Sequence, residues 1–153
     1  MRNYRNVMVI VLLAMVLVIS GCNSEGTNQN LNVEKTSSSD AKVEKIEIYH
    51  FHGTNQCYSC KTVGAYAEET VNTYFAEEVK NGKVTFAHIN GELAENRELV
   101  TKYGVTGSSL WIGVYDNEGF HKEENVNVWY KIDDKEAYMT YLKGIIEQKL
   151  GGN

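Results

Sequence analysis

Residues 45–61 read KIEIYHFHGTNQCYSCK, and this stretch decides the fold. Its first seven residues are rich in β-branched and aromatic side chains, and Gly53 follows soon after, which is typical of a strand that ends at a turn. Cys57 and Cys60 come next, in Cys-x-x-Cys spacing. Apolar residues then recur at spacings of three and four, which indicates a long helix that runs to about Val79. The two cysteines therefore fall between a strand and the start of a helix.

Beyond this helix, hydrophobic periodicity and turn residues predict five more elements. They are strands at 83–90, 109–115 and 125–130, and helices at 94–103 and from Asp133 onward. The last two strands are joined through the Asp-Asn-Glu-Gly of 116–119, a hairpin signal. The order β-α-β-α-β-β-α predicts an α/β fold, in which a central mixed sheet of about four strands is flanked by helices on both faces.

The N-terminal residues differ in kind from the rest of the chain. Arg2 and Arg5 precede an unbroken apolar run of thirteen residues at 7–19, and Ser-Gly-Cys ends the segment at Cys22. A basic region, a short apolar run and small residues are typical of a secretory signal. The Ile-Ser-Gly-Cys of 19–22 resembles the lipobox of prokaryotic lipoproteins, in which the cysteine carries lipid after cleavage. The alternative is an ordinary signal peptide or signal anchor with an incidental cysteine.

The expected organisation has three parts: a lipoprotein signal peptide at 1–21, a polar lipid-anchored flexible linker at 22–42, and one domain at 43–153. Loss of 1–21 takes the formal charge from -5 to -7, because two arginines and no acids leave. An acidic chain without a cluster of Lys and Arg argues against nucleic acid as a partner. We expect an exported monomer, held by lipid on Cys22 at the outer face of a cell membrane or on the periplasmic side.

Three segments together resemble the thioredoxin superfamily. They are the strand, loop, Cys-x-x-Cys and helix that begin at 45, the KVTFAHIN of 83–90 in the place of the second strand, and the KYGVTGSSLWIGVYDNEG of 102–119. The resemblance covers about 45–150, which is the whole presumed domain. It implies a thioredoxin-like fold and a thiol–disulfide oxidoreductase that uses no cofactor beyond its own cysteine pair.

The chemistry is expected at Cys57 and Cys60. The N-terminus of a helix presents unpaired N–H groups and a partial positive charge, which favour a thiolate over a thiol. The resemblance assigns Cys57 as the attacking thiol and Cys60 as the resolving thiol. Lys61 adds a positive charge nearby. The expected partner is a protein that carries a thiol or a disulfide, or an electron carrier.

One departure from the superfamily concerns the loop that faces the cysteines, where thioredoxins carry a cis-proline. This chain contains no proline. The resemblance puts Ser109 in that place, after Ser108, and the bond between them is expected to be either trans or held cis by local packing. The Ser109 hydroxyl and N–H, which proline would lack, would then hydrogen-bond a thiolate. Alternatively, the loop without proline would leave room for a metal. Ser108, Ser109 and Trp111 are candidates for one wall of the site.

Two histidines lie close to the cysteines in the sequence. If the strand continues, His50 and His52 point to the same face, and with Cys57 and Cys60 they form an alternative metal shell. His50 also falls near the place where thioredoxins bury an acid beneath the resolving cysteine, and there it would take the proton from Cys60. A structural, hydrogen-bonded role stays open for both histidines.

Two other interpretations of the whole domain therefore stay open. One is a metal-binding or metal-delivery module that uses the cysteines and a nearby histidine, and the other is a thioredoxin-fold binding protein without turnover. His88 and His121 are expected in a strand and a loop without partners, so the sequence assigns them no role.

Overall fold

The computed structural model describes residues 42–151. The expected signal peptide, Cys22 and all of the expected linker except Lys42 lie outside these residues. None of the helices within the described range combines the length and the apolar character that a membrane-spanning segment needs.

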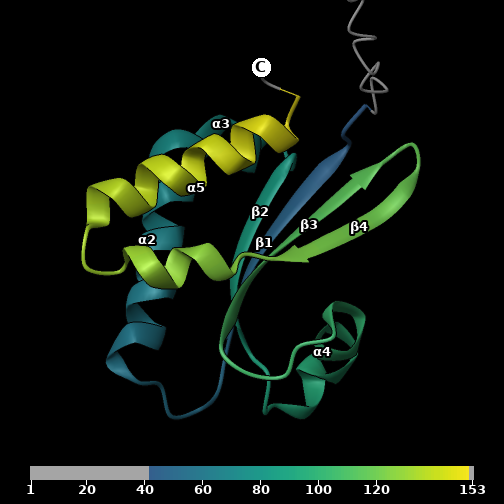
Figure 1. Ribbon diagram of the computed structural model, residues 1–153. Helices are drawn as coiled ribbons and strands as arrows, with labels where there is room; N and C mark the ends of the chain where they lie inside the picture. The colour runs from purple at the N-terminus through teal and green to yellow at the C-terminus, as the bar shows by residue number, and fades with distance from the viewer. Residues whose placement is uncertain (1–41, 152–153) are drawn as a thin grey trace, which may run out of the picture. The chain divides into compact units, whose positions relative to one another are not determined.

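A four-stranded sheet in the order β2-β1-β3-β4 forms the centre of the domain (Figure 1). Its strands are β1 (Lys45–His52), β2 (Val84–Asn90), β3 (Ser109–Asp116) and β4 (Gly119–Glu124). β1 lies parallel to β2 and antiparallel to β3, and β3 pairs with β4 in a hairpin. The structure confirms the predicted mixed sheet of four strands.

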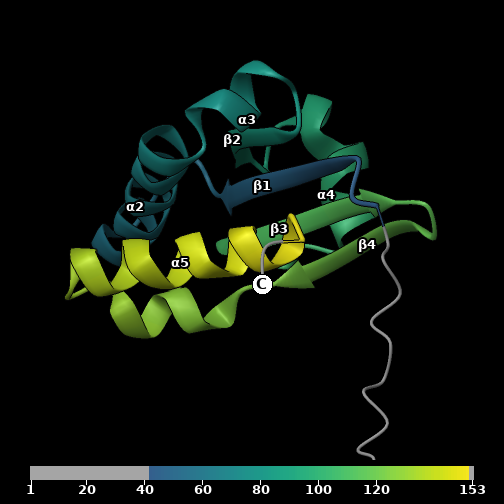
Figure 2. The same ribbon diagram turned by 90° about the horizontal axis from the view of Figure 1, so that it is seen from above.

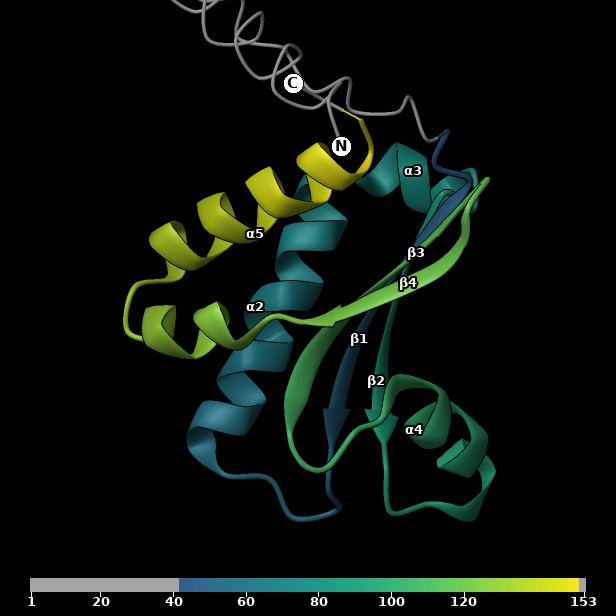
Figure 3. The same cartoon turned by 45° about the vertical axis from the view of Figure 1, so that its right-hand side comes forward.

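Helices cover both faces of this sheet, as predicted. The helical segments are α2 (Tyr58–Tyr74), α3 (Ala76–Lys80), η1 (Ala94–Asn96), α4 (Arg97–Tyr103), η2 (Val126–Lys131) and α5 (Lys135–Lys149). α2 and α5 pack together on one side of the strands, and α4 lies on the other side (Figures 2 and 3). The strand order and the helical crossover from β1 to β2 make this a thioredoxin-like α/β fold.

Alternation along β1 assigns its side chains to two different layers. Ile46 and Ile48 face α2 and α5 and belong to the main hydrophobic core. Glu47 and Phe51 face the opposite way, toward the buried Tyr103 at the end of α4. The core on the α2 side comprises Ile46, Ile48, Val63, Ala67, Val71, Phe75, Val84, Leu110, Ile112, Val128, Tyr138, Leu142 and Ile146. The two layers fix β1 in the middle of the domain, with its C-terminal end free to carry the cysteine loop.

The prediction of a strand at 125–130 is wrong. This segment forms the short helix η2, and the hairpin partner of β3 is β4. β4 is an edge strand in which nearly every side chain is exposed, so it lacks the alternation that reveals a half-buried strand. The apolar alternation in η2 is misleading, because Val128 is buried whereas Val126 and Tyr130 are 51% and 87% exposed.

The helix expected to continue to Val79 is broken at Phe75, whose backbone leaves the helical region at φ -128° and ψ 26°. The side chain of Phe75 is buried in the main core, so the break directs an aromatic ring inward between α2 and α3. At the last helix, the residue that caps α5 is Asp134, not Asp133, and its carboxylate accepts from the N–H of Ala137 at 3.0 Å.

Candidate active site

Cys57 is the N-cap residue of α2, and Cys60 lies in the first turn of that helix. The two side chains form a disulfide, and their Cα atoms are 5.1 Å apart. The Cys57 sulfur also accepts a hydrogen bond from the backbone N–H of Cys60 at 3.1 Å. This N–H is one of the unpaired donors at a helix start, so the same contact stabilises negative charge on Cys57 in the reduced protein.

The two cysteines differ in their access to solvent. Cys57 is exposed, and the neighbouring Tyr58 side chain is 78% exposed. Cys60, in the first turn of α2, is half-buried. A partner sulfur therefore reaches Cys57 more easily than Cys60.

A groove of about 240 Å³ opens at the edge of the sheet where β1 and β2 end. Its walls come from the end of β1, the segment after β2, and the segment from α4 to β3. They are Phe51, His52, Gly53, Gly91, Glu92, Val100, Val105, Thr106, Gly107 and Ser108. The loops are tied to one another, since the Thr54 N–H donates to Glu92 at 3.1 Å and the Gly91 N–H donates to the His52 carbonyl at 2.9 Å.

Ser108 lines this groove, but Ser109 and Trp111 do not. Ser109 is 3% exposed; its hydroxyl donates to the Gly107 carbonyl at 3.0 Å and accepts from the Trp111 indole N–H at 3.0 Å. The hydroxyl expected to face a thiolate is therefore engaged within the loop itself. No cis peptide bond occurs within residues 42–151, so the Ser108–Ser109 bond is trans.

His50 is buried against the first turns of α2, and its side chain contacts Gly64. A Cβ added at Gly64 would lie 2.3 Å from His50 Nδ1, so only glycine permits this approach. Burial, together with the nearby rings of His88 and His52, lowers the pKa of His50 from 6.5 to about 4. The backbone of Cys60, which faces the ring, acts in the opposite direction. His50 is therefore neutral at pH 7, and among the described residues its Nε2 has no hydrogen-bond partner.

His88, to which the sequence assigned no role, contacts His50 directly. The parallel register places the two residues opposite each other, and their Nδ1 atoms are 3.0 Å apart. His88 Nε2 lies 3.3 Å from a carboxylate oxygen of Glu68 on α2. A sequence signal existed for this pair, because parallel alignment of KIEIYHFH with VTFAHIN from Ile46 and Val84 brings the histidines into register.

The histidines share a second hollow, of about 280 Å³, between the sheet and α2. As predicted, His50 and His52 are on one face, with ring centroids 5.4 Å apart. The hollow is lined by His50, His52, Gln56, Lys61, Ala65, Glu68 and His88, so Lys61 borders the histidine cluster. Within 42–151, no group of three or more His, Cys, Asp or Glu side chains is arranged to hold a metal ion. The metal site stays a hypothesis.

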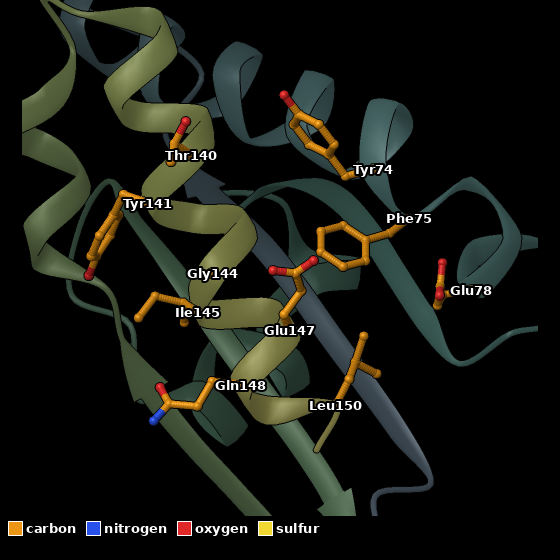
Figure 4. A pocket seen from close by; sticks show the side chains of 10 residues that line it. All are labelled: Tyr74, Phe75, Glu78, Thr140, Tyr141, Gly144, Ile145, Glu147, Gln148 and Leu150. Atoms are coloured by element: carbon orange, nitrogen blue, oxygen red, sulfur yellow. The ribbon is translucent and has the colours of Figure 1, made fainter. Parts of the chain in front are cut away.

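A larger hollow, of about 860 Å³, lies at the other end of α2 from the cysteines (Figure 4). It is an open surface depression beside α5, and its lining mixes apolar side chains with the carboxylates of Glu78 and Glu147. Nothing there resembles the chemistry of the cysteine end, so the candidate site is the region around Cys57 and Cys60.

No known protein-family model matches the chain, and no curated protein matches it. Among solved structures, the Trx4 domain of ERdj5 is similar with a TM-score of 0.46 and 14% identity, over 71% of this chain and 85% of that one. Oxidised thioredoxin O2 from Arabidopsis thaliana is similar with a TM-score of 0.42 and 14% identity, over 69% of this chain and 75% of that one. A Plasmodium falciparum thioredoxin is similar with a TM-score of 0.39 and 16% identity, over 80% of this chain and 97% of that one. Because these TM-scores lie below 0.5, the assignment rests on strand order, crossover and cysteine position, and on those features the domain is thioredoxin-like.

Proposed function

We propose that this protein is a thiol–disulfide oxidoreductase that exchanges its Cys57–Cys60 disulfide with the thiols or the disulfide of a partner protein. The observation that carries the proposal is the position of the Cys57 sulfur. It is exposed at the start of α2 and accepts the Cys60 N–H at 3.1 Å. Such a position lowers the free energy of the thiolate, which is the form that attacks disulfides.

The exchange has two steps, here written for reduction of the partner. The Cys57 thiolate attacks a partner disulfide, forms a mixed disulfide and releases one partner thiolate. Cys60 then loses its proton and attacks the Cys57 sulfur, which breaks the mixed disulfide and releases the second partner thiolate. Two electrons pass from the cysteine pair to the partner, and the reverse sequence oxidises a partner dithiol.

The surroundings supply a base and a place for the partner. Neutral His50, buried next to the Cys60 backbone, takes the proton of the resolving thiol. The partner segment lies along the groove lined by Ser108, where Gly107 leaves the backbone open to contact. No cofactor is required for either step.

A redox titration tests this proposal. The protein is equilibrated in glutathione buffers of varied composition, free thiols are counted, and reduction of insulin disulfides by the reduced protein is followed. We expect a reversible two-electron transition and insulin reduction, both lost in Cys57→Ser. Tyr58→Phe is a matched control, because it changes an exposed neighbour without removing sulfur, and it should behave as wild type. Insulin reduction by Cys57→Ser at the wild-type rate would contradict the proposal.

We propose further that the protein is exported and anchored by lipid on Cys22. The apolar run at 7–19 and the lipobox-like residues 19–22 support this. Cys22→Ser should move the protein from the membrane fraction to the soluble fraction and leave insulin reduction unchanged. Retention of a signal-cleaved Cys22→Ser protein in the membrane fraction would contradict lipid anchoring.

A further inference from the structure

The buried His50 is joined to the surface by two polar contacts that simple exchange does not require. Its Nδ1 lies 3.0 Å from Nδ1 of His88, and Nε2 of His88 lies 3.3 Å from Glu68 Oε2. His50 is 1% exposed, whereas the side chains of His88 and Glu68 are 39% and 51% exposed. The three residues come from β1, β2 and α2, and together they lead from the protein interior beside Cys60 to solvent.

Glu68 determines which ring nitrogens carry protons in the neutral state. An ionised carboxylate only accepts, so His88 donates from Nε2 and its Nδ1 has no proton. Because the two Nδ1 atoms are in contact, His50 must then donate from Nδ1. Neutral His50 is left with a bare Nε2, and this is the buried atom that has no partner within the described residues. In this tautomer the unpartnered atom is free to accept a proton.

The His50 ring lies beside the first two turns of α2, which include the resolving thiol. The His50 ring is in contact range of the Gly64 Cα, four residues after Cys60, and it faces the Cys60 backbone. An unmade hydrogen bond at a buried nitrogen costs stability, so its retention at this position needs a reason. Acceptance of the Cys60 proton is such a reason.

We propose that His88 and Glu68, together with His50, form a proton path from Cys60 to solvent. This path rests on the proposed thiol–disulfide exchange and acts in its second step. His88 and Glu68 are relay and positioning residues: they set the His50 tautomer and remove the proton that His50 receives.

The step balances as follows. The Cys60 thiol gives its proton to His50 Nε2, the Nδ1 proton of His50 passes to His88 Nδ1, and the Nε2 proton of His88 passes to Glu68 or to water. The Cys60 thiolate attacks the Cys57 sulfur, the bond to the partner sulfur breaks, and the departing partner thiolate takes a proton from water. No charge is left on the buried ring.

The two steps can be timed separately with an aromatic disulfide whose thiol product is coloured. The first equivalent of coloured thiol reports attack by Cys57, and the second reports resolution by Cys60. We expect His88→Gln to slow the second phase about tenfold and Glu68→Gln to slow it roughly threefold, since water replaces part of a general acid–base path. The first phase should not change in either variant.

A structural role would not produce the same signature as a relay. In His88→Ala, added imidazole should restore the second phase in proportion to its concentration, because the enlarged hollow is open to solvent. The pH dependence of the second phase should also change in His88→Gln. The charged and titratable groups that face His50 in this profile are His52 from β1, His88 from β2, and Lys61 and Glu68 from α2.

The chain offers matched controls for both variants. His121 is an exposed histidine on β4 that pairs with Asp116 at 3.3 Å, and Glu69 on α2 pairs with Lys135 at 2.6 Å. His121→Gln and Glu69→Gln should leave both phases at the wild-type rate, and thermal unfolding checks that every variant is folded. A wild-type second phase in folded His88→Gln, or no response of His88→Ala to imidazole, would overturn the relay alone. Absence of both phases in the wild type would overturn the exchange function as well.

Discussion

β1 buries one titratable side chain on each of its faces, and the surroundings of the two differ. Glu47, on the α4 side, accepts hydrogen bonds from Tyr103 and Tyr115 at 2.9 Å each and from Lys45 at 2.8 Å. His50, on the α2 side, has one hydrogen-bonding contact and an unpartnered Nε2. Fully satisfied buried polar networks make a fold rigid, whereas a buried group with an unmade hydrogen bond costs stability.

The pKa values of the two groups follow from this difference. Burial by itself raises the pKa of Glu47, but hydrogen bonds from Lys45, Tyr103 and Tyr115 and the charge of Lys102 bring it down to about 2. The pKa of His50 falls to about 4, chiefly because its ring is buried. One face of β1 therefore holds a charge in a hydrogen-bonded network, and the other holds a neutral imidazole near the backbone of Cys60.

The largest expected effect is the loss of stability with falling pH. The unfolded chain binds a proton at His50 below about pH 6.5, whereas the folded protein binds it only below about pH 4. The free energy of unfolding therefore falls as the pH is lowered from about 6.5 to about 4. Glu47 stabilises the fold above about pH 4.5, and this contribution is lost as pH falls toward 2. Each window is worth roughly 3 kcal/mol in the free energy of unfolding.

Urea unfolding between pH 7 and pH 2 measures the two windows. His50→Leu should flatten the upper window only, and Glu47→Gln the lower one only. If both variants retain the full wild-type pH dependence, the two groups are not responsible for it.

At pH 7, Glu47→Gln should lower the free energy of unfolding by about 3 kcal/mol, because it removes the charge that Lys45 and the two tyrosine hydroxyls were placed to meet. Both phases of thiol release should stay within about twofold of wild type, since this face carries no exchange chemistry. Glu44→Gln, at an exposed position just before β1, is the control and should change neither quantity. A slowed second phase in Glu47→Gln would break the contrast between the faces.

His50→Leu should have the opposite pattern. Replacing a buried ring that has an unmade hydrogen bond with an apolar side chain should change the free energy of unfolding by less than about 1 kcal/mol. The second phase of thiol release should slow about 100-fold, the lower range for a general base. Stopped-flow measurement of the coloured thiol gives the rate, and an unchanged second phase would remove His50 from the mechanism.

The smallest expected effect concerns two glycines, one packed against the His50 ring and one packed against Tyr103, the hydrogen-bond partner of Glu47. A Cβ at Gly64 would lie 2.3 Å from His50 Nδ1, and one at Gly113 would lie 2.1 Å from the Tyr103 hydroxyl. Gly64→Ala and Gly113→Ala should each lower the free energy of unfolding by about 1–2 kcal/mol through overpacking. Only Gly64→Ala should also slow the second phase, a few-fold, because it displaces the His50 ring.

Gly144 provides the control for these substitutions. It lies in α5, and a Cβ there would meet nothing within 4 Å, so Gly144→Ala should stabilise the protein by about 0.5–1 kcal/mol. If Gly113→Ala slows the second phase as much as Gly64→Ala does, the faces are coupled and the comparison fails.

The sequence was sufficient to predict the features that depend on local pattern. The strand at the start of the domain, the Cys-x-x-Cys at a helix N-terminus and the hairpin turn at 116–119 all follow from neighbouring residues, and the structure contains them. β4 was missed because an exposed edge strand buries almost nothing and so leaves no hydrophobic period.

Features that depend on distant contacts were harder to predict. His88 contacts His50 across 38 residues, and only the register of the β1–β2 pair shows the contact. The Ser109 hydroxyl is taken up by Trp111 and the Gly107 carbonyl, which the alternation of a strand does not indicate. The sequence thus identified Cys57, Cys60 and His50, but the contacts around them depend on tertiary packing, which local pattern does not reveal.

The most direct test of the account is to trap the mixed disulfide with a partner peptide that carries a single disulfide. In Cys60→Ser, the attacking thiol remains and the resolving thiol is gone, so the account predicts a stable covalent adduct through Cys57, visible by mass spectrometry. In Cys57→Ser, the exposed thiolate at the start of α2 is gone and no adduct should accumulate. Accumulation in Cys57→Ser and none in Cys60→Ser would contradict the central claim that Cys57 is the attacking thiol of a thiol–disulfide oxidoreductase.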